Sequence, residues 1–136
     1  MLKRDSLTAQ MQQLSQVLAK VKRLIIEDAE DEARSVTFAV FLDYYQLDDK
    51  DLLVLTEDQF IEKIRNKKLQ PEEVNMLAYF LDEYAGLQEE LSSQLHLYAK
   101  YLLLVAMLED EYQFVSLDHI ARKDLLVKQL SQISRN

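Results

Sequence analysis

The chain has 136 residues, of which 49% are hydrophobic and 29% are charged, and its formal net charge is −8. One glycine, one proline and no cysteine exclude the turns of a β-rich domain, the glycine-lined site of an α/β nucleotide-binding domain, disulfides and thiolate metal sites. The composition therefore predicts a single all-α domain over residues 1–136, and the apolar spacing along it predicts five to six antiparallel helices stacked as helical hairpins.

The first predicted helix begins at Asp5 or Ser6 and ends at about Ile26. Its apolar residues recur at steps of three and four, which is the period of one helical stripe, and glutamine, serine and lysine occupy the other face. The stripe consists of Leu7, Met11, Leu14, Leu18, Val21 and Ile25.

A second helix is expected from about Asp28 to Gln46. Acidic residues begin it, which suits the positive end of a helix dipole. Its predicted inner stripe contains Ala29, Ala33, Val36, Val40 and Tyr44, and is widened by Phe38, Phe41 and Tyr45. We therefore expect this helix to bury more than one face.

The middle of the chain predicts short elements. Residues 47–50 are expected to be a connection, and residues 51–55 a single helical turn. Thr56 followed by Gln59 is a capping-box pattern, in which each side chain bonds to the other residue's backbone amide. This pattern predicts a short helix that ends at about Asn66.

Pro71 predicts the next helix start, because proline is favoured at the first helical position. Gly86 could end this helix as a left-handed cap or lie inside a longer helix that ends at Leu91. We expect the longer helix, because Leu87 and Leu91 extend its apolar surface. Ser92 and Ser93 are then expected to cap a new helix that ends at about Leu108.

The last predicted helix follows a polar connection at residues 109–111. Ser116 is its expected cap, and it should run from Leu117 to about Ile133. Ile120, Val127 and Leu130 are predicted to pack it against the rest of the protein.

The distribution of charge is uneven along the chain. Residues 1–26 carry five basic side chains and one acidic side chain, whereas residues 27–60 carry eleven acidic and two basic ones. The dominant negative field argues against binding to nucleic acid. The longest apolar run, Tyr101–Leu108, is much too short to span a bilayer, and the N-terminus lacks the features of a secretory signal. We expect a cytoplasmic protein without membrane contact.

The sequence resembles two kinds of helical protein, one over residues 71–108 and one over most of its length. Residues 71–108 resemble a degenerate tetratricopeptide unit, with two antiparallel helices and a tight turn. The whole chain is similar to a family of short bacterial helical proteins of unknown function that are distantly tetratricopeptide-like. The matching segments are AQMQQLSQVLAKV at residues 9–21, LLVLTEDQFIEKI at residues 52–64 and SSQLHLYAKYLLL at residues 92–104. The resemblance implies a tetratricopeptide-like array or a compact bundle and transfers no catalytic residue.

Motifs for catalysis or cofactor binding are not apparent in the sequence. His96 and His119 lack the glutamate three residues earlier that di-iron bundles use, and His119 is expected to cap its helix or face solvent. Glu89 and Glu90 could reach a metal together with His96, but a surface histidine is the favoured interpretation. One glycine cannot form a phosphate-binding loop. We therefore predict no catalytic residue, no cofactor and no metal, although a pair of catalytic carboxylates would be invisible in the sequence.

The aromatic residues offer the best candidates for binding a partner. Tyr44 and Tyr45 lie on different faces of one predicted helix, as do Tyr98 and Tyr101, so the two members of each pair cannot be equally buried. One ring of each pair could line a groove and present a partly polar ring to a partner.

Three functions follow from these observations. The first is a non-enzymatic helical module that binds a protein or peptide, or forms a homodimer through its first helix. The second is a small-ligand or catalytic pocket between helices. The third is a regulator that contacts nucleic acid through basic residues of the first helix, which the net charge opposes.

Overall fold

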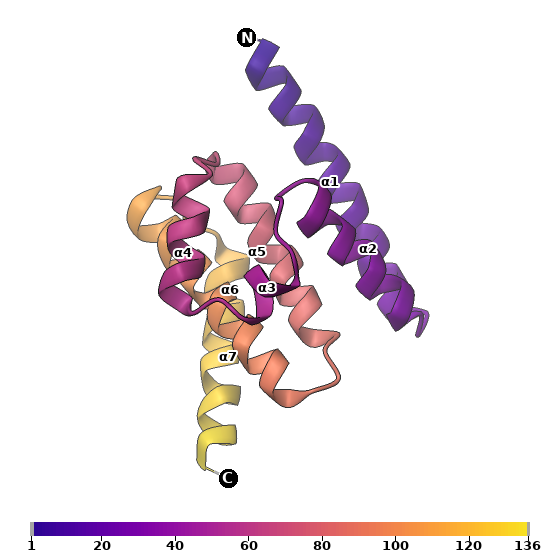
Figure 1. Ribbon diagram of the computed structural model, residues 1–136, viewed down its shortest axis with the longest axis vertical. Helices are drawn as coiled ribbons and strands as arrows, with labels where there is room; N and C mark the ends of the chain where they lie inside the picture. The colour runs from indigo at the N-terminus through magenta and orange to yellow at the C-terminus, as the bar shows by residue number, and fades with distance from the viewer. Residues whose placement is uncertain (1, 136) are drawn as a thin grey trace.

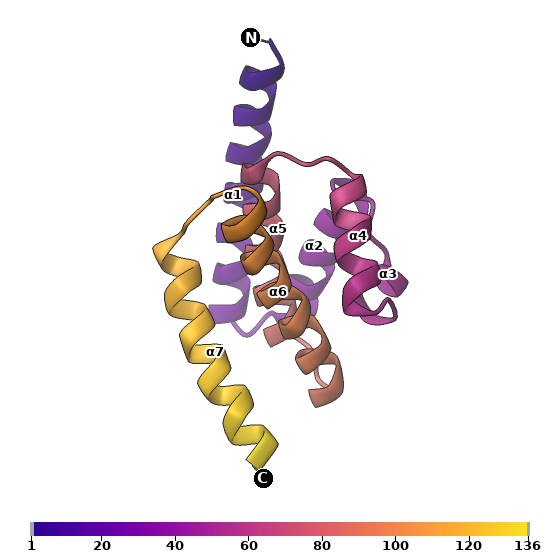
Figure 2. The same cartoon turned by 90° about the vertical axis from the view of Figure 1, so that its left-hand side faces the viewer.

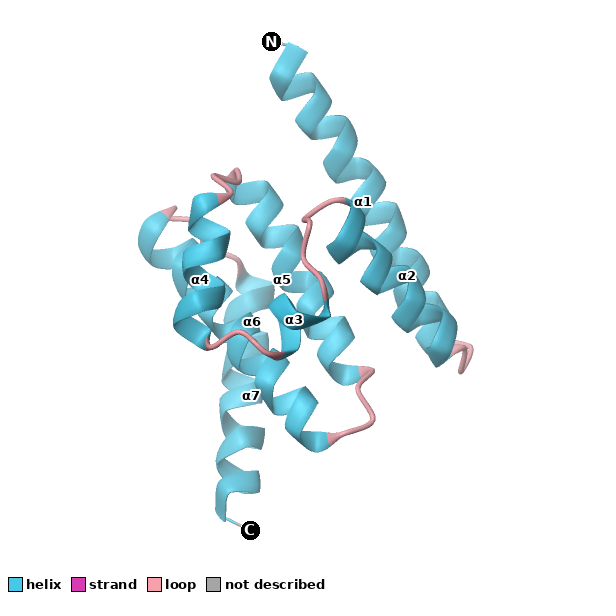
Figure 3. Ribbon diagram, in the orientation of Figure 1, coloured by secondary structure: helices cyan, strands magenta, loops and turns pink. Residues whose placement is uncertain are grey.

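The computed structural model describes residues 2–135, and the side chains of residues 5–133. Within these residues the chain forms seven helices and no strand. Figure 1 shows how the helices are arranged, and Figure 3 colours them by secondary structure. They are α1 (Leu2–Ile26), α2 (Glu30–Asp43), α3 (Asp49–Leu53), α4 (Glu57–Asn66), α5 (Pro71–Gly86), α6 (Leu91–Glu111) and α7 (Leu117–Arg135). The all-α prediction is confirmed, and the number of helices is slightly higher than the expected five or six.

The hairpin of α5 and α6 lies at the centre of the fold. The α1–α2 hairpin packs on α5, the short helices α3 and α4 pack on α6, and α7 lies along α6. The N-terminal end of α1 and the C-terminal end of α7 extend away from the other helices at opposite ends (Figure 1 and Figure 2). No helix in the described residues is both long and apolar enough to cross a membrane.

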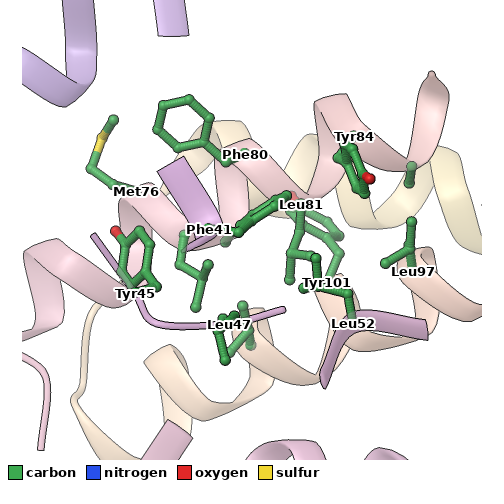
Figure 4. Packing of buried hydrophobic residues seen from close by; sticks show 14 of the residues in the cluster. Phe41, Tyr45, Leu47, Leu52, Met76, Phe80, Leu81, Tyr84, Leu97 and Tyr101 are labelled. Atoms are coloured by element: carbon green, nitrogen blue, oxygen red, sulfur yellow. The ribbon is translucent and has the colours of Figure 1, made fainter. Parts of the chain in front are cut away.

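Large aromatic and aliphatic side chains fill the space between the central hairpin and its neighbours, as Figure 4 shows. Phe41 from α2 meets Tyr84 from α5 edge to face, with ring centroids 5.2 Å apart. The fully buried side chains include Tyr45, Tyr101, Phe41, Phe60, Phe80, Leu47, Leu52, Ile64, Leu77, Leu81 and Leu97. Each such side chain stabilises the fold by roughly 1.5–3 kcal/mol relative to exposure.

Local capping defines the short helices as the sequence indicated. The Thr56 side chain accepts a hydrogen bond from the amide of Gln59, whose own side chain accepts from the amide of Thr56, so the predicted capping box is present. Asp48 and Asp51 form a second box at the start of α3. Pro71 occupies the start of α5, as predicted.

The expected continuation of the helix past Gly86 is wrong, because α5 ends there and α6 begins at Leu91. Gly86 does not have the left-handed conformation either. The chain turns because Leu87 is buried and its carbonyl oxygen accepts from Arg34 Nη1 at 2.7 Å. Glu90, and not a serine, precedes the first residue of α6, and no side chain caps that end.

Other boundaries also differ from the predictions. α2 ends at Asp43, because Gln46 has a positive φ of 52° and its side chain donates to the carbonyl oxygens of Asp43 and Tyr44. α6 continues through the acidic residues 109–111, which were expected to be a connection.

The predicted buried face of α7 is also wrong. The side chains of Ile120 and Val127 are 38% and 47% exposed, Leu130 is half-buried, and His119 and Leu126 are the buried residues instead. The difference follows from the inward position of a histidine that finds polar partners on α5 and α6.

Candidate functional site

The four candidate tyrosines separate into two groups. Tyr45 and Tyr101 are 0% and 1% exposed, so their rings belong to the core and do not reach the surface. Tyr44 and Tyr98 are half-buried and each lines a surface hollow. Contact with a partner therefore stays a prediction for Tyr44 and Tyr98, while burial removes Tyr45 and Tyr101 from the accessible surface.

Tyr44 and Tyr45 hold the start of α5 through Glu73. The Tyr44 hydroxyl donates to Glu73 Oε2 at 2.8 Å, and the Tyr45 hydroxyl donates to the Glu73 carbonyl oxygen at 2.6 Å. Burial, followed by the nearby carboxylate, raises the pKa of Tyr44. Burial also raises the pKa of Tyr45. Both rings are therefore fixed and neutral at ordinary pH.

A groove with an apolar floor runs between α1 and the end of α2. We call it the α1–Tyr44 groove. It has a volume of about 530 Å³ and is lined by Gln10, Gln13, Leu14, Gln16, Val17, Lys20 and Tyr44. A second hollow of about 710 Å³ lies on the other flank of α1, beside Glu72. The N-terminal half of α1 is thus open on both sides.

Tyr98 lines a smaller hollow of about 380 Å³ where α1, α5, α6 and α7 meet. Arg122 lies over the Tyr98 ring and makes a two-pronged ion pair with Asp82, at 2.8 and 2.9 Å. Lys22 lies 3.6 Å from Glu83, and burial raises the pKa of this carboxyl group. Four of the charged side chains of this hollow are thus paired with one another, while Glu30, which also lines it, pairs with Arg34 outside it.

Lys100 is a fully buried lysine that sequence reasoning missed. Its ammonium group donates to the carbonyl oxygens of Leu52 at 2.6 Å and Leu55 at 2.9 Å, and contacts His96 Nε2 at 2.6 Å. The Nζ atom also lies 5.5 Å from the centre of the Phe60 ring. Burial lowers the pKa of Lys100 to about 8.

His96 therefore accepts a hydrogen bond from a cation. Burial, followed by the charge of Lys100, lowers the pKa of His96 and favours the neutral ring. Glu89 and Glu90, which the sequence suggested as companion metal ligands, are exposed. No group of three metal-binding side chains occurs among the described residues.

His119 lies in a polar cluster at the interface of α7 with α5 and α6. Its ring is 3% exposed, which contradicts the capping or solvent role expected from the sequence. Nδ1 lies 2.8 Å from the Tyr101 hydroxyl, and Nε2 lies 2.7 Å from Asn75 Oδ1. The Tyr79 ring stacks on it at 4.5 Å. The cap at this helix is Ser116, as predicted, which accepts from the His119 amide at 3.4 Å.

These two clusters connect helices through hydrogen bonds of Lys100 and His119. The side chains that line the hollows described above include neither histidine nor Lys100. Polar spacing on α5, with Asn75, Tyr79 and Asp82 on one face, was the available signal for the His119 cluster. The other members of the cluster, Tyr101 on α6 and His119 on α7, are so far from α5 in the sequence that helical periodicity could not predict their contact with it.

The sequence matches no protein-family model, and neither the curated proteins nor the solved structures gave a match.

Proposed function

We propose that this protein is a non-enzymatic helical interaction module, and that it binds one amphipathic helical segment of a partner protein in the α1–Tyr44 groove. The observation that supports this function is the groove itself. Leu14, Val17 and the ring of Tyr44 line it, and its open volume of about 530 Å³ is left free by the described part of the chain. A partner helix with apolar side chains at steps of three and four fits such a groove.

The charge around the groove favours a partner with acidic residues beside its apolar stripe. Lys20 lines the groove and makes no ion pair within the described residues. Residues 1–26 carry five basic side chains and one acidic one. Lys22 and Arg23 are paired with Glu83 and Glu27, so Lys20 is the basic side chain that lines the groove. At physiological salt, charges more than about 8 Å apart are largely screened, so this local charge counts for more at the groove than the net charge of −8.

The same charges disfavour a second copy of α1 as the occupant. Pairing two α1 helices would bring two positively charged segments together, and like charges in contact oppose association. Glutamines Gln10, Gln13 and Gln16 on the rim can donate to carboxylates as well as accept from other groups. We therefore commit to a different protein as partner, and homodimerisation through α1 becomes an outcome of the test.

Two synthetic peptides of about 20 residues test the proposal. Both carry the same leucine and isoleucine stripe, and one has glutamates beside the stripe where the other has lysines. Nuclear magnetic resonance of the isotope-labelled protein should show amide shifts at Gln13, Val17 and Tyr44 with the acidic peptide. The basic peptide should bind at least tenfold more weakly, which corresponds to about 1.4 kcal/mol.

Variants locate the site and separate the possible failures. Lys20→Glu should weaken binding of the acidic peptide, whereas Lys50→Glu, at an exposed position of α3, should not. Equal binding of both peptides would contradict the acidic chemistry of the partner. Binding of neither peptide would contradict the docking function, and dimerisation with shifts at the same residues would replace the partner with a second copy.

We also propose that the α5–α6 hairpin is stacked with its neighbours in a tetratricopeptide-like manner and that the protein acts in the cytoplasm. The stacking is supported by the α1–α2 and α5–α6 hairpins, which pack against each other through α1, α2 and α5. The location is supported by the composition of the sequence, which lacks cysteine.

A further inference from the structure

Helix α7 is attached to the protein by few buried side chains. Among its residues 117–133, only His119 and Leu126 are buried. Several of its apolar side chains face outward, including Leu117 at 82% exposure and Leu125 at 48%. Because hydrophobic burial contributes so little here, the polar contacts of His119 have an unusually large share in holding α7 in place.

The partners of His119 define its protonation state. Asn75 Oδ1 can only accept a hydrogen bond, so Nε2 carries a hydrogen and donates to it. The other ring nitrogen, Nδ1, is then unprotonated and accepts from the Tyr101 hydroxyl. Both nitrogens of a neutral ring are therefore satisfied, each by a different helix, Asn75 on α5 and Tyr101 on α6.

A second proton on the ring would break this arrangement. Nδ1 would become a donor, and the Tyr101 hydroxyl would have to turn and accept from it. The hydroxyl hydrogen would then need a new acceptor in a place where Tyr101 is 1% exposed. A buried polar hydrogen without an acceptor and a buried cation both cost free energy.

We propose that His119 is a proton-operated latch, and that its protonation releases α7 from α5 and α6. This inference is independent of the groove on α1. It depends on the geometry of one buried ring between three helices, and on the small number of other buried contacts that α7 makes.

Charged and titratable groups surround the ring on all three helices. They are Tyr79 and Asp82 on α5, Tyr101 and Glu109 on α6, and Asp118 and Arg122 on α7. Asp82 is paired with Arg122, and Asp118 accepts from the Tyr79 hydroxyl at 3.3 Å. Burial is the larger influence and lowers the pKa of His119, while Asp118, Asp82 and Glu109 oppose it.

Acid should favour the release of α7, because docking lowers the pKa of His119. Released α7 has an ordinary histidine with a pKa near 6.5, whereas the docked ring has a lower one. The released form therefore binds a proton more readily, and acid favours release. The docking constant should fall by up to tenfold for each pH unit below 6.5, until the pKa of the docked ring is reached.

Amide hydrogen exchange on the full chain tests the latch. Exchange rates of α7 and α5 are compared at pH 7.5 and 5.5, each corrected for the intrinsic rate at that pH. We expect protection in α7 to fall several-fold at the lower pH while protection in α5 is unchanged. Constant protection in α7, or an equal loss in both helices, would overturn the proposal.

Two matched variants assign the effect to one histidine. His119→Gln keeps an acceptor and a donor without a titratable ring, so its α7 protection should not depend on pH. His96→Gln keeps an acceptor for Lys100 and should behave as the unsubstituted protein does.

A measurement without substitution covers the case in which His119→Gln does not fold. The loss of α7 protection should follow the titration of the His119 ring resonances in the unsubstituted protein. If it follows the His96 ring instead, the latch is assigned to the wrong residue and the proposal fails.

Discussion

Lys100 on α6 donates a hydrogen bond of 2.6 Å to the carbonyl oxygen of Leu52 on α3. α3 ends at Leu53, so the ammonium group satisfies a carbonyl at the C-terminal end of a helix, where intrahelical donors are missing. A second carbonyl oxygen, of Leu55, accepts from the same group. With His96 as third acceptor, the three hydrogens of Lys100 are all used, and a five-residue helix is fixed to the centre of the fold.

Replacement of Lys100 by methionine should lower the free energy of unfolding by about 1–3 kcal/mol. Methionine fills similar space, but the carbonyl oxygens of Leu52 and Leu55 lose their donor, and an unsatisfied buried polar group costs about that amount. Urea denaturation followed by circular dichroism measures the change. Lys50→Met, at an exposed position of α3, should change stability by less than about 0.5 kcal/mol. Equal effects of the two substitutions would contradict the role of Lys100.

Relative to Lys100→Met, the unsubstituted protein should gain stability between pH 8 and pH 10. The pKa of Lys100 is about 8 in the folded protein and 10.5 ordinarily, because burial disfavours the charged form. Between these values the unfolded chain binds more protons than the folded chain, so a higher pH favours folding.

The expected rise is on the order of 1–2 kcal/mol, and it should be absent in Lys100→Met. Chemical denaturation at a series of pH values measures it. From about pH 9 upward the buried tyrosines oppose this rise, because burial raises the pKa of tyrosines such as Tyr45 and Tyr101 and the unfolded chain then loses protons more readily. Parallel profiles of the unsubstituted protein and Lys100→Met from pH 8 to 10 would show that Lys100 keeps its ordinary pKa in the folded protein.

Substitution of Tyr101 by phenylalanine should raise the pKa of His119. The Tyr101 hydroxyl donates to Nδ1 of the neutral ring, and removing a hydrogen bond to the neutral form makes protonation easier. Nuclear magnetic resonance titration of the His119 ring measures the shift. Tyr112→Phe, at the half-buried residue that follows the last residue of α6, is the control and should leave the titration unchanged. A lower pKa in Tyr101→Phe would mean that the hydroxyl accepts from the ring.

Much of the fold could be predicted from the spacing of apolar residues and from the residues that cap helices. Thr56 with Gln59 and the proline at residue 71 marked helix starts correctly, because these residues act on backbone groups only a few positions away. The end of α5 was not predictable in this way. It depends on Arg34, which reaches the Leu87 carbonyl oxygen from another helix, and such tertiary contacts override local preference.

The candidate site was less predictable than the fold. The tyrosine pairs were expected to differ in burial, and they do, but periodicity could not say that Tyr44 and Tyr98 are the accessible members. Lys100 and His119 are polar residues in buried positions, where hydrophobic patterning expects apolar ones. Their burial is possible only because acceptors come from residues 44–48 positions away in the sequence.

Substitution of Gly86 by alanine should stabilise the protein by about 0.5–1 kcal/mol. Gly86 ends α5 without a positive φ, so alanine can adopt its conformation and reduces the entropy of the unfolded chain. An added Cβ would lie 3.5 Å from the Tyr98 hydroxyl oxygen, which is an ordinary contact. Thermal and urea denaturation measure the change. A loss of stability would mean that this turn requires glycine.

Introducing a glycine, rather than replacing one, should stabilise the turn at Lys68. Lys68 follows the end of α4 with a positive φ of 53°, at the position where helices most often place glycine. A side chain in the left-handed region costs about 1–2 kcal/mol, while glycine costs part of that in unfolded-state entropy. Lys68→Gly should therefore stabilise the protein by roughly 0.5–1 kcal/mol in urea denaturation. The neighbouring Lys67 has a φ of −74°, and Lys67→Gly should destabilise the protein instead, because there glycine adds entropy to the unfolded chain without relieving strain. If both substitutions destabilise, the turn at residue 68 is not left-handed in solution.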